Sequence, residues 1–369
     1  MSWTPDGYVA VVTIFNYQRF RHIEAPGWTL GWTWAKEEEL IWATVGARTK
    51  ERGDCSRFKG NIPASCKKDP QVVDLPRKAP YSMQVANCCR GGVISTGIQD
   101  PANSASSFQL SVGRSGTTNR TVLLPKHFTL TAPGAGYACG AAKVVRPTRF
   151  VSPDGRRMTQ VLIEALTWNV TCTSTQFLVR KTPTCCVALS AFYNEAVADC
   201  PLCACGCHTR PAQPGRGCAE KDESGFAPSV QCTPHMCPIR VHWHVEHDIR
   251  KYWRVQVTVT NFDYRKNYSE WNLGVQHPNF NNNLARAFGL NYKSLPDDTA
   301  MLWGIKRYNG LLREAGRFGH VQGELLFRKK GPSTFALQKG WAFARRVYFN
   351  GDSCVMPPPD AYPQLTNSV

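Results

Sequence analysis

The chain has 369 residues, a length that accommodates about two domains. Because 42% of the residues are hydrophobic and 19% are charged, the composition excludes a disordered chain and a coiled coil. Lysine and arginine number 44 against 27 acidic residues, a formal charge of +17, and the best apolar run, residues 8–15, is far shorter than the roughly 20 residues that cross a membrane.

Strand-like segments begin near the start of the chain. Residues 8–15 are rich in β-branched and aromatic side chains, and Trp28, Leu30, Trp32 and Trp34 alternate with small or polar residues. On a strand, a period of two places these four apolar side chains on one face. Gly, Pro and Asn interrupt such runs at short intervals, which favours an all-β chain.

The middle of the chain differs from its two ends. Residues 167–172 have strand character, and the stretch that follows is rich in cysteine, glycine, proline and charge. Little regular structure is expected there, so disulfide bonds would supply the local stability.

The second half repeats the first weakly but in the same order. The segment 253–262 resembles residues 8–17, and Trp271-Asn-Leu-Gly274 corresponds to Trp28-Thr-Leu-Gly31. Each copy then ends on a cysteine that precedes prolines. This order indicates two related domains.

The simplest architecture is all-β, with two tandem antiparallel β-sandwich domains joined and stapled by a cysteine-rich segment. The first domain is expected over residues 1–150, the connecting segment with its strand over 151–237, and the second domain over 238–369. Short helices are expected at residues 284–288 and 311–316.

The second copy contains one strand more than the first. Residues 239–245 alternate apolar and polar side chains directly before the second copy, and the first copy has no room for a counterpart. A sandwich without this edge strand would expose unpaired backbone. We therefore expect residues upstream of Met1 to be missing from this chain, among them a strand and the signal peptide that a secreted protein requires.

The 16 cysteines are the strongest compositional signal. The run from Cys200 to His208 has the spacing of a metal site in a reducing compartment, whereas in an oxidising one the cysteines would pair as disulfides. We favour disulfides and leave their connectivity open. The candidates are Cys55, Cys66, Cys88, Cys89, Cys139, Cys172, Cys185, Cys186, Cys200, Cys203, Cys205, Cys207, Cys218, Cys232, Cys237 and Cys354.

Three sequons support the oxidising compartment. Asn119, Asn169 and Asn267 each begin an Asn-X-Ser/Thr triplet in a polar or turn-flanked stretch where a glycan would be exposed. They are the candidate glycosylation sites of an extracellular protein.

No catalytic motif stands out. The serine hydrolase, zinc protease, P-loop and dinucleotide-binding patterns are all missing from the sequence. His242, His244 and His247 resemble a metal site, but the first two would share a strand face as solvated side chains. The acidic run 37–39 fits a turn rather than the paired carboxylates of a glycosidase. We predict no enzyme, no cofactor and no metal.

Aromatic side chains suggest binding instead. Trp28 has an equivalent tryptophan in the second copy, whereas Trp32 and Trp34 correspond to Val275 and His277. The two are therefore either peripheral core or an exposed platform that the second domain lacks. Indoles two residues apart on a strand lie about 7 Å from each other, a spacing that suits flat sugar rings.

Tyr17 and Phe20, in the loop that follows the first strand, would extend such a platform. The predicted ligand-binding residues are Trp32, Trp34, Trp28, Tyr17 and Phe20.

The basic residues occur in scattered pairs such as Lys67-Lys68 and Arg345-Arg346. Nucleic-acid binding conflicts with the sequons and disulfides, so no nucleic-acid partner is predicted. An acidic polysaccharide or an anionic membrane surface fits better, and ordinary solvated surface charge is the remaining alternative.

Several long motifs resemble the plant COBRA-like family over essentially the whole chain. They include Trp3-Thr-Pro-Asp-Gly-Tyr8, Ala25-Pro-Gly-Trp28-Thr-Leu-Gly-Trp32-Thr-Trp34, Gln231-Cys-Thr-Pro-His-Met-Cys237 and Lys339-Gly-Trp341. The sequence departs from the family at Ser65, where the family often has a second cysteine before Cys66.

The resemblance implies a glycosylated extracellular protein without known catalysis, acting in cellulose microfibril organisation and oriented cell expansion at the plasma membrane and cell wall. It also implies a cellulose-binding module that would include the Trp28–Trp34 block. Contact with the membrane would then occur only through a glycosylphosphatidylinositol anchor. Asn367 is the candidate attachment residue, although the apolar tail of an anchor signal does not follow it.

The predicted partner is therefore cellulose or a related glucan. The alternative is a structural or adhesion protein that binds acidic matrix polysaccharide by charge.

Overall fold

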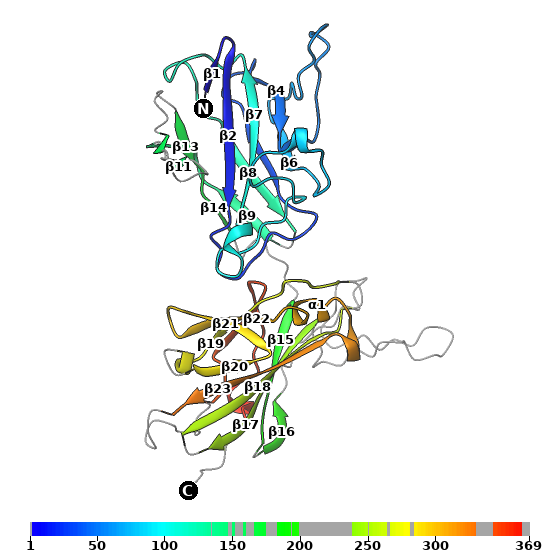
Figure 1. The fold of residues 1–369 in the computed structure, drawn as a ribbon, viewed down its shortest axis with the longest axis vertical. Coiled ribbons are helices and arrows are strands. Elements are labelled where there is room, and N and C mark those ends of the chain that lie inside the picture. Colours follow the sequence, from blue (N-terminus) through cyan, green and yellow to red (C-terminus); the bar gives the residue numbers. More distant parts are fainter. Residues whose placement is uncertain are drawn as a thin grey trace, which may run out of the picture. The chain divides into compact units, whose positions relative to one another are not determined.

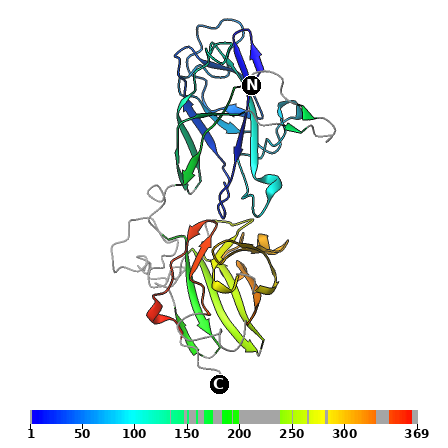
Figure 2. The same cartoon turned by 90° about the vertical axis from the view of Figure 1, so that its left-hand side faces the viewer.

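The computed structural model shows an almost entirely β-stranded protein, which confirms the all-β class (Figures 1 and 2). The chain forms two compact units, Met1–Arg180 and Lys181–Val369, which divide inside the predicted connecting segment. The residues that the structure describes are 2–133, 135–146, 150–151, 158–159, 166–174, 183–192, 194–198, 238–249, 251–263, 266–280, 284–329 and 342–363.

One sheet of the first unit has four antiparallel strands. The central strands β2 and β7 pair along their full lengths, from Gly7 opposite Gly113 to Phe15 opposite Ala105. In order across the sheet, the strands are β1 (Ser2–Thr4), β2 (Gly7–Phe15), β7 (Ala105–Gly113) and β4 (Leu40–Val45).

The other main sheet of the first unit has six strands, all paired antiparallel. Two small two-stranded sheets, β10 (Lys143–Val145) with β13 (Thr167–Asn169) and β11 (Phe150–Val151) with β12 (Met158–Thr159), accompany it. The six strands, in order, are β14 (Cys172–Ser174), β9 (Ala135–Cys139), β8 (Lys126–Ala132), β3 (Thr29–Thr33), β6 (Gln71–Asp74) and β5 (Ala47–Thr49).

The two main sheets of the first unit share one hydrophobic core. Tyr8 and Ala10 of β2 and Phe108 of β7 belong to the same buried cluster as Leu30 of β3 and Val72 of β6. Alternation along β2 and β7 thus directs every second side chain into this core and leaves the others outside.

The second unit also contains two larger sheets. Its six-stranded sheet has one parallel pair, β15 with β17, among antiparallel neighbours. In order, these strands are β16 (Asn194–Ala198), β15 (Cys185–Ala191), β17 (Ile239–Ile249), β18 (Tyr252–Asn261), β23 (His320–Arg328) and β20 (Leu284–Phe288).

The five-stranded sheet of the second unit comprises β21 (Leu290–Leu295), β22 (Thr299–Gly304), β19 (Leu273–Gln276), β24 (Arg346–Phe349) and β25 (Asp352–Ser353). One core cluster includes Trp243 and Trp253 of the six-stranded sheet and Val275 and Phe349 of the five-stranded sheet. The predicted strand over 239–245 is therefore present as part of β17, which pairs with β18.

Helical structure is sparse in the described residues. The predicted short helix over 284–288 is wrong: this segment is strand β20, because hydrogen bonds to the edge of β23 satisfy its backbone, whereas five residues are too few for a stable helix. The helical elements are α1 (Tyr308–Leu311) and the 3₁₀ turns η1 (Tyr81–Met83), η2 (Pro101–Asn103), η4 (Pro278–Phe280), η5 (Gly316–Phe318) and η7 (Pro359–Ala361).

No helix in the described parts of the chain combines the length and apolar character that a membrane crossing requires.

Disulfides brace both units. Within the described residues four pairs are formed, Cys55–Cys66, Cys88–Cys89, Cys139–Cys172 and Cys185–Cys354, and Cys186 is disulfide-bonded as well. Cys139–Cys172 joins β9 to β14, and Cys185–Cys354 ties the first residue of β15 to the segment after β25. The remaining candidates lie outside the described residues: Cys200, Cys203, Cys205, Cys207, Cys218, Cys232 and Cys237.

Candidate functional site

The predicted tryptophan platform is wrong. Trp28, Trp32 and Trp34 are only 1%, 6% and 2% exposed, and all three belong to the core of the first unit together with Leu30. The alternation does place these side chains together, but on the inner side of β3 and its flanks. None of them can stack against a ligand at the surface.

Packing explains this burial. Trp28 stacks on Phe108 of the facing sheet at 5.7 Å between ring centroids, and Trp32 meets Trp34 edge-on at 5.3 Å. Val275 and His277, which correspond to Trp32 and Trp34 in the second unit, are buried too. The difference between the two copies is therefore a different way of filling equivalent core space.

The other two predicted binding residues are placed differently. Tyr17 is 86% exposed and stacks on Phe15, with ring centroids 5.8 Å apart and planes 22° from parallel. Phe15 is itself 56% exposed, whereas Phe20 is half-buried. A planar aromatic surface thus exists at the end of β2. Alternation along β2 could have revealed Phe15, since the even-numbered residues face the core.

This aromatic pair borders an uncharged sheet surface. No residue of β1, β2, β7 or β4 carries a charge, although 19% of the chain is charged. On the outer side, Val11 is 67% exposed and pairs with Gln109, while Thr13 and Ser107 share a hydrogen bond of 2.9 Å between their hydroxyls.

We name this surface the neutral face. It consists of the outward side chains of β2, β7 and β4, namely Val9, Val11, Thr13, Phe15, Ala105, Ser107, Gln109, Ser111, Ala43 and Val45.

Trp42 lies at the opposite end of the neutral face from Phe15. A Cβ added to Gly113, on the outer side of β7, would lie 2.1 Å from Trp42 Nε1 and 2.8 Å from Asp6 Oδ2, so the indole rests directly on the glycine backbone. The indole N–H donates to Asp6 Oδ2 at 3.3 Å. Since β7 runs about 27 Å at roughly 3.4 Å per residue, the neutral face is a long strip with aromatic rings at both ends.

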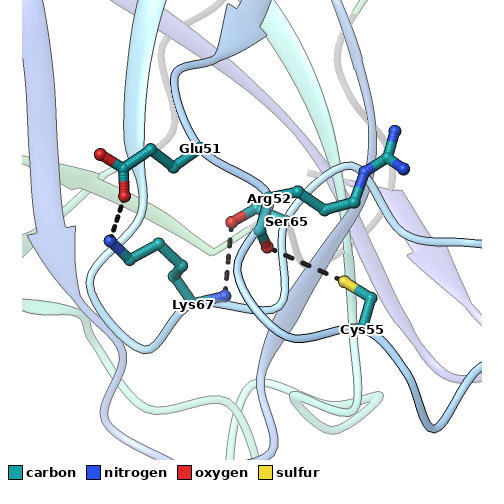
Figure 3. A network of polar contacts seen from close by, with 5 residues as sticks. All are labelled: Glu51, Arg52, Cys55, Ser65 and Lys67. Atoms are coloured by element: carbon teal, nitrogen blue, oxygen red, sulfur yellow. Dashed lines mark hydrogen bonds and ion pairs between the residues drawn. The ribbon is translucent and has the colours of Figure 1, made fainter.

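The loop beside Trp42 is fixed at its base (Figure 3). Ser65 and Ile41 exchange two backbone hydrogen bonds of 2.9 and 3.0 Å, which add this stretch to the edge of β4. Lys67 donates its backbone N–H to Ser65 Oγ at 3.3 Å, and its ammonium forms a 2.5 Å ion pair with Glu51. Together with the Cys55–Cys66 disulfide, these contacts hold the loop tip in place.

A cavity of about 510 Å³ opens beside Trp28 and the peptide bond between Pro26 and Gly27. Its acidic residue, Asp74, accepts backbone N–H groups from Leu75, Cys89, Arg90 and Gly92 at 2.9–3.0 Å. This carboxylate therefore organises the loop that carries the Cys88–Cys89 disulfide. Its hydrogen bonds indicate a structural role rather than a chemical one.

The histidines of β17 form no recognisable metal site in the described residues. Ser190 Oγ lies 2.7 Å from both His242 Nε2 and His244 Nδ1, so the hydroxyl bridges the two rings. No group of three or more His, Cys, Asp or Glu side chains in the described part of the chain is placed to hold a metal ion. The side chain of His247 lies outside the described residues.

The three sequon asparagines, Asn119, Asn169 and Asn267, are all exposed. Asn119 sits in a turn whose backbone is held by Thr118 and Thr121, with 2.9 Å between their hydroxyl oxygens. Each side chain is accessible to a glycan. Asn367 lies outside the described residues.

Two buried groups at the edge of the first core have raised pKa values. Burial raises the pKa of Glu39, which is 2% exposed and accepts the backbone N–H of Lys36 at 3.0 Å. Burial, followed by the nearby Glu39 charge, raises the pKa of Tyr8. Both pKa shifts result mainly from burial in the core, so they affect the stability of the fold and do not indicate a catalytic site.

Comparison with known proteins gives full-length matches. The COBRA N-terminal domain matches residues 8–175, and the COBRA family C-terminal domain matches 184–229 and 213–363. Protein COBRA of Arabidopsis thaliana is 59% identical over 386 residues, which cover 100% of this chain and 83% of that protein. COBRA-like protein 3 of Oryza sativa subsp. japonica is 60% identical, with the same two coverages.

Solved structures are similar only distantly. A GH20 exo-β-N-acetylglucosaminidase from Vibrio harveyi matches with a TM-score of 0.26 and 12% identity, over 35% of this chain and 19% of the other. The chitin-binding domain of a Pyrococcus furiosus chitinase matches with a TM-score of 0.23 and 12% identity, over 33% of this chain and 97% of that domain. Neither likeness bears on function.

Proposed function

Since the chain belongs to the COBRA family, we propose that it is a non-catalytic polysaccharide-binding protein of the cell wall, which holds cellulose or a related glucan on the neutral face. Family membership supports a cell-wall-related function. In this proposal the protein acts outside the cell, in cellulose microfibril organisation and oriented cell expansion.

The observation that carries the proposal is the neutral face itself. An extended glucan chain is flat and uncharged, and its ring C–H groups suit aromatic and aliphatic surfaces while its hydroxyls suit the partly exposed Thr13 and Gln109. The strip offers Phe15 and Tyr17 at one end and Trp42 at the other. A strongly basic protein that keeps one whole sheet free of charge has a surface suited to a neutral polymer.

The expected strength is modest. If each aromatic ring covers about 60–80 Å² of sugar surface, the gain is about 1.5–2 kcal/mol per ring. After the costs of association, a few such contacts give roughly micromolar to millimolar affinity. This range suits a protein that grips a polymer at many points.

Glycosylation and anchoring belong to the same proposal. The exposure of Asn119, Asn169 and Asn267 supports glycans at these positions. A lipid anchor near Asn367 would keep the protein at the outer side of the plasma membrane, and it would be the only contact with the membrane.

Retention on crystalline cellulose tests the proposal. The full chain carrying Phe15→Ala and Tyr17→Ala should lose about a hundredfold or more in affinity for cellulose, because two exposed rings are removed and the core is untouched. Tyr292→Ala, at an exposed tyrosine of β21, is the matched control. Equal retention of all three proteins would contradict the proposal.

Ionic strength separates this function from the alternative of charge-driven binding. Stacking on the neutral face should persist at 0.5 M salt, whereas retention that depends on the +17 charge should decline steeply.

A further inference from the structure

Two arginines from distant parts of the chain meet on one aromatic ring. Arg57 lies two residues after Cys55 in the loop closed by Cys55–Cys66, and Arg114 directly follows β7. Their guanidinium carbons are 5.2 and 5.1 Å from the ring centroid of Phe58. The fold thus concentrates two permanent positive charges beside one hydrophobic surface.

The Phe58 ring that contacts both arginines is itself fixed by packing and by a backbone hydrogen bond. Phe58 packs edge-on against Trp42, with 5.4 Å between ring centroids and 76° between planes, and its N–H donates to the Cys55 carbonyl at 3.0 Å. Trp42 rests on Gly113, and the N–H of Arg114 donates to the Asp6 carbonyl at 2.8 Å. The cluster of Trp42, Arg57, Phe58 and Arg114 is therefore assembled before any ligand arrives.

Two carboxylates lie near the cluster, those of Asp54 and of Asp6, whose Oδ2 accepts the Trp42 indole N–H at 3.3 Å. Among the residues that the structure describes, no carboxylate forms an ion pair with the side chain of Arg57 or Arg114. Asp54 is close enough that Arg57 contributes, after hydrogen bonds from Ser56, to lowering its pKa. Both guanidiniums thus keep N–H donors for an external anion.

We propose that this cluster binds the carboxylates of an acidic polysaccharide, a polyuronate chain, and so gives the protein a second ligand class beyond the neutral glucan. Guanidinium groups pair with carboxylates in bidentate fashion, and the partly exposed indole of Trp42 offers an aromatic face to the ring C–H groups of the same sugar. A polyuronate presents one carboxylate per sugar, so two neighbouring arginines can engage one chain. The overall charge of +17 draws such a polymer to the protein.

Binding of the full chain to polygalacturonate tests this inference. Arg57→Gln and Arg114→Gln should each weaken binding by about three- to tenfold, and the double variant by more, because each removes a charge-assisted pair at a partly exposed site. Arg77→Gln, at an exposed arginine of the same unit, should bind like the native protein. The fully methyl-esterified polymer, which has the same backbone without the charge, should bind at least tenfold more weakly.

Three results would overturn the inference: native-like binding by the double glutamine variant, equal binding of the esterified polymer, or native-like binding by the double variant Arg57→Lys and Arg114→Lys. The last result would show that charge alone is sufficient without guanidinium geometry. Retention on cellulose is measured on the same variants. It should stay unchanged, so a failure of the glucan proposal and a failure of this one give different patterns.

Discussion

Trp34 shows how strongly a single core residue constrains the first unit. Its indole is 2% exposed and packs against Trp32. Replacing it with alanine should lower the free energy of unfolding by about 3–5 kcal/mol, because the enclosed cavity cannot collapse fully. Chemical denaturation measures the change, with Tyr17→Ala as a surface control that shifts stability by less than about 0.5 kcal/mol. A stable Trp34→Ala protein that had lost glucan binding would restore the platform interpretation.

Glu39 makes stability depend on pH. Its pKa is raised by burial, so the folded protein binds this proton more tightly than the unfolded chain does. The buried Glu39 carboxylate therefore destabilises the folded protein at pH values above its raised pKa. This destabilisation disappears as the pH falls to the pKa of glutamate in the unfolded chain, near 4.3.

Glu39→Gln should accordingly increase stability at pH 7, where the buried charge is otherwise present, and change it little at pH 4. The amide oxygen can still accept the Lys36 N–H. Urea denaturation of both proteins at the two pH values measures the difference. A glutamine variant that is less stable at pH 7 would contradict this account of the buried carboxyl.

At the scale of elements, β7 positions Trp42. Gly113→Ala should displace the indole, since the added methyl would lie 2.1 Å from Trp42 Nε1. We expect weaker retention on cellulose and weaker polygalacturonate binding together, by a factor of several, because Trp42 borders both surfaces. Gly60→Ala is the matched control, as an added Cβ there meets no atom within 4 Å. Native-like binding by Gly113→Ala would show that neither ligand depends on this ring.

Sequence periodicity predicted β2, β18 and the strand character of the Trp28–Trp34 block, because alternation is a local property. It could not decide which side of β3 faces the core, since that depends on the opposing sheet, where Phe108 receives Trp28. For the same reason the sequence pattern cannot tell that the three tryptophans are core, and the platform that Tyr17 and Phe20 are predicted to extend is not formed by them. Tyr17 is exposed, but it stacks on Phe15 of β2 instead.

No pattern in the sequence predicts that Arg57 and Arg114 lie close together. Arg57 and Arg114 are 57 positions apart and meet only because the Cys55–Cys66 loop lies along the edge of β4. The orientation of Trp42 could not be predicted from the sequence either, because a register irregularity between Ile41 and Ala43 interrupts the alternation of inward and outward side chains. Contacts that depend on loops and bulges are set by tertiary packing rather than by local pattern.

At the scale of the whole molecule, the two units reuse one construction with different outer surfaces. The outward residues of β1, β2, β7 and β4 carry no charge, whereas the corresponding sheet of the second unit carries Arg254 within 3.6 Å of Glu246 and 3.5 Å of Glu324. The sequence repeat therefore explains why each unit has a core of the same kind. The different outer faces of the two units explain why glucan binding is proposed for one of them. Neutral polymer binding is expected of the first unit only.

The most direct test places one charge in the middle of the neutral face. Val11 is 67% exposed, so Val11→Lys should leave the fold intact, as circular dichroism can verify, and Val11→Thr serves as an uncharged control. If the neutral face holds glucan, the lysine variant of the full chain should lose at least tenfold in retention on crystalline cellulose, while the threonine variant stays close to native. Undiminished retention of Val11→Lys would contradict the account.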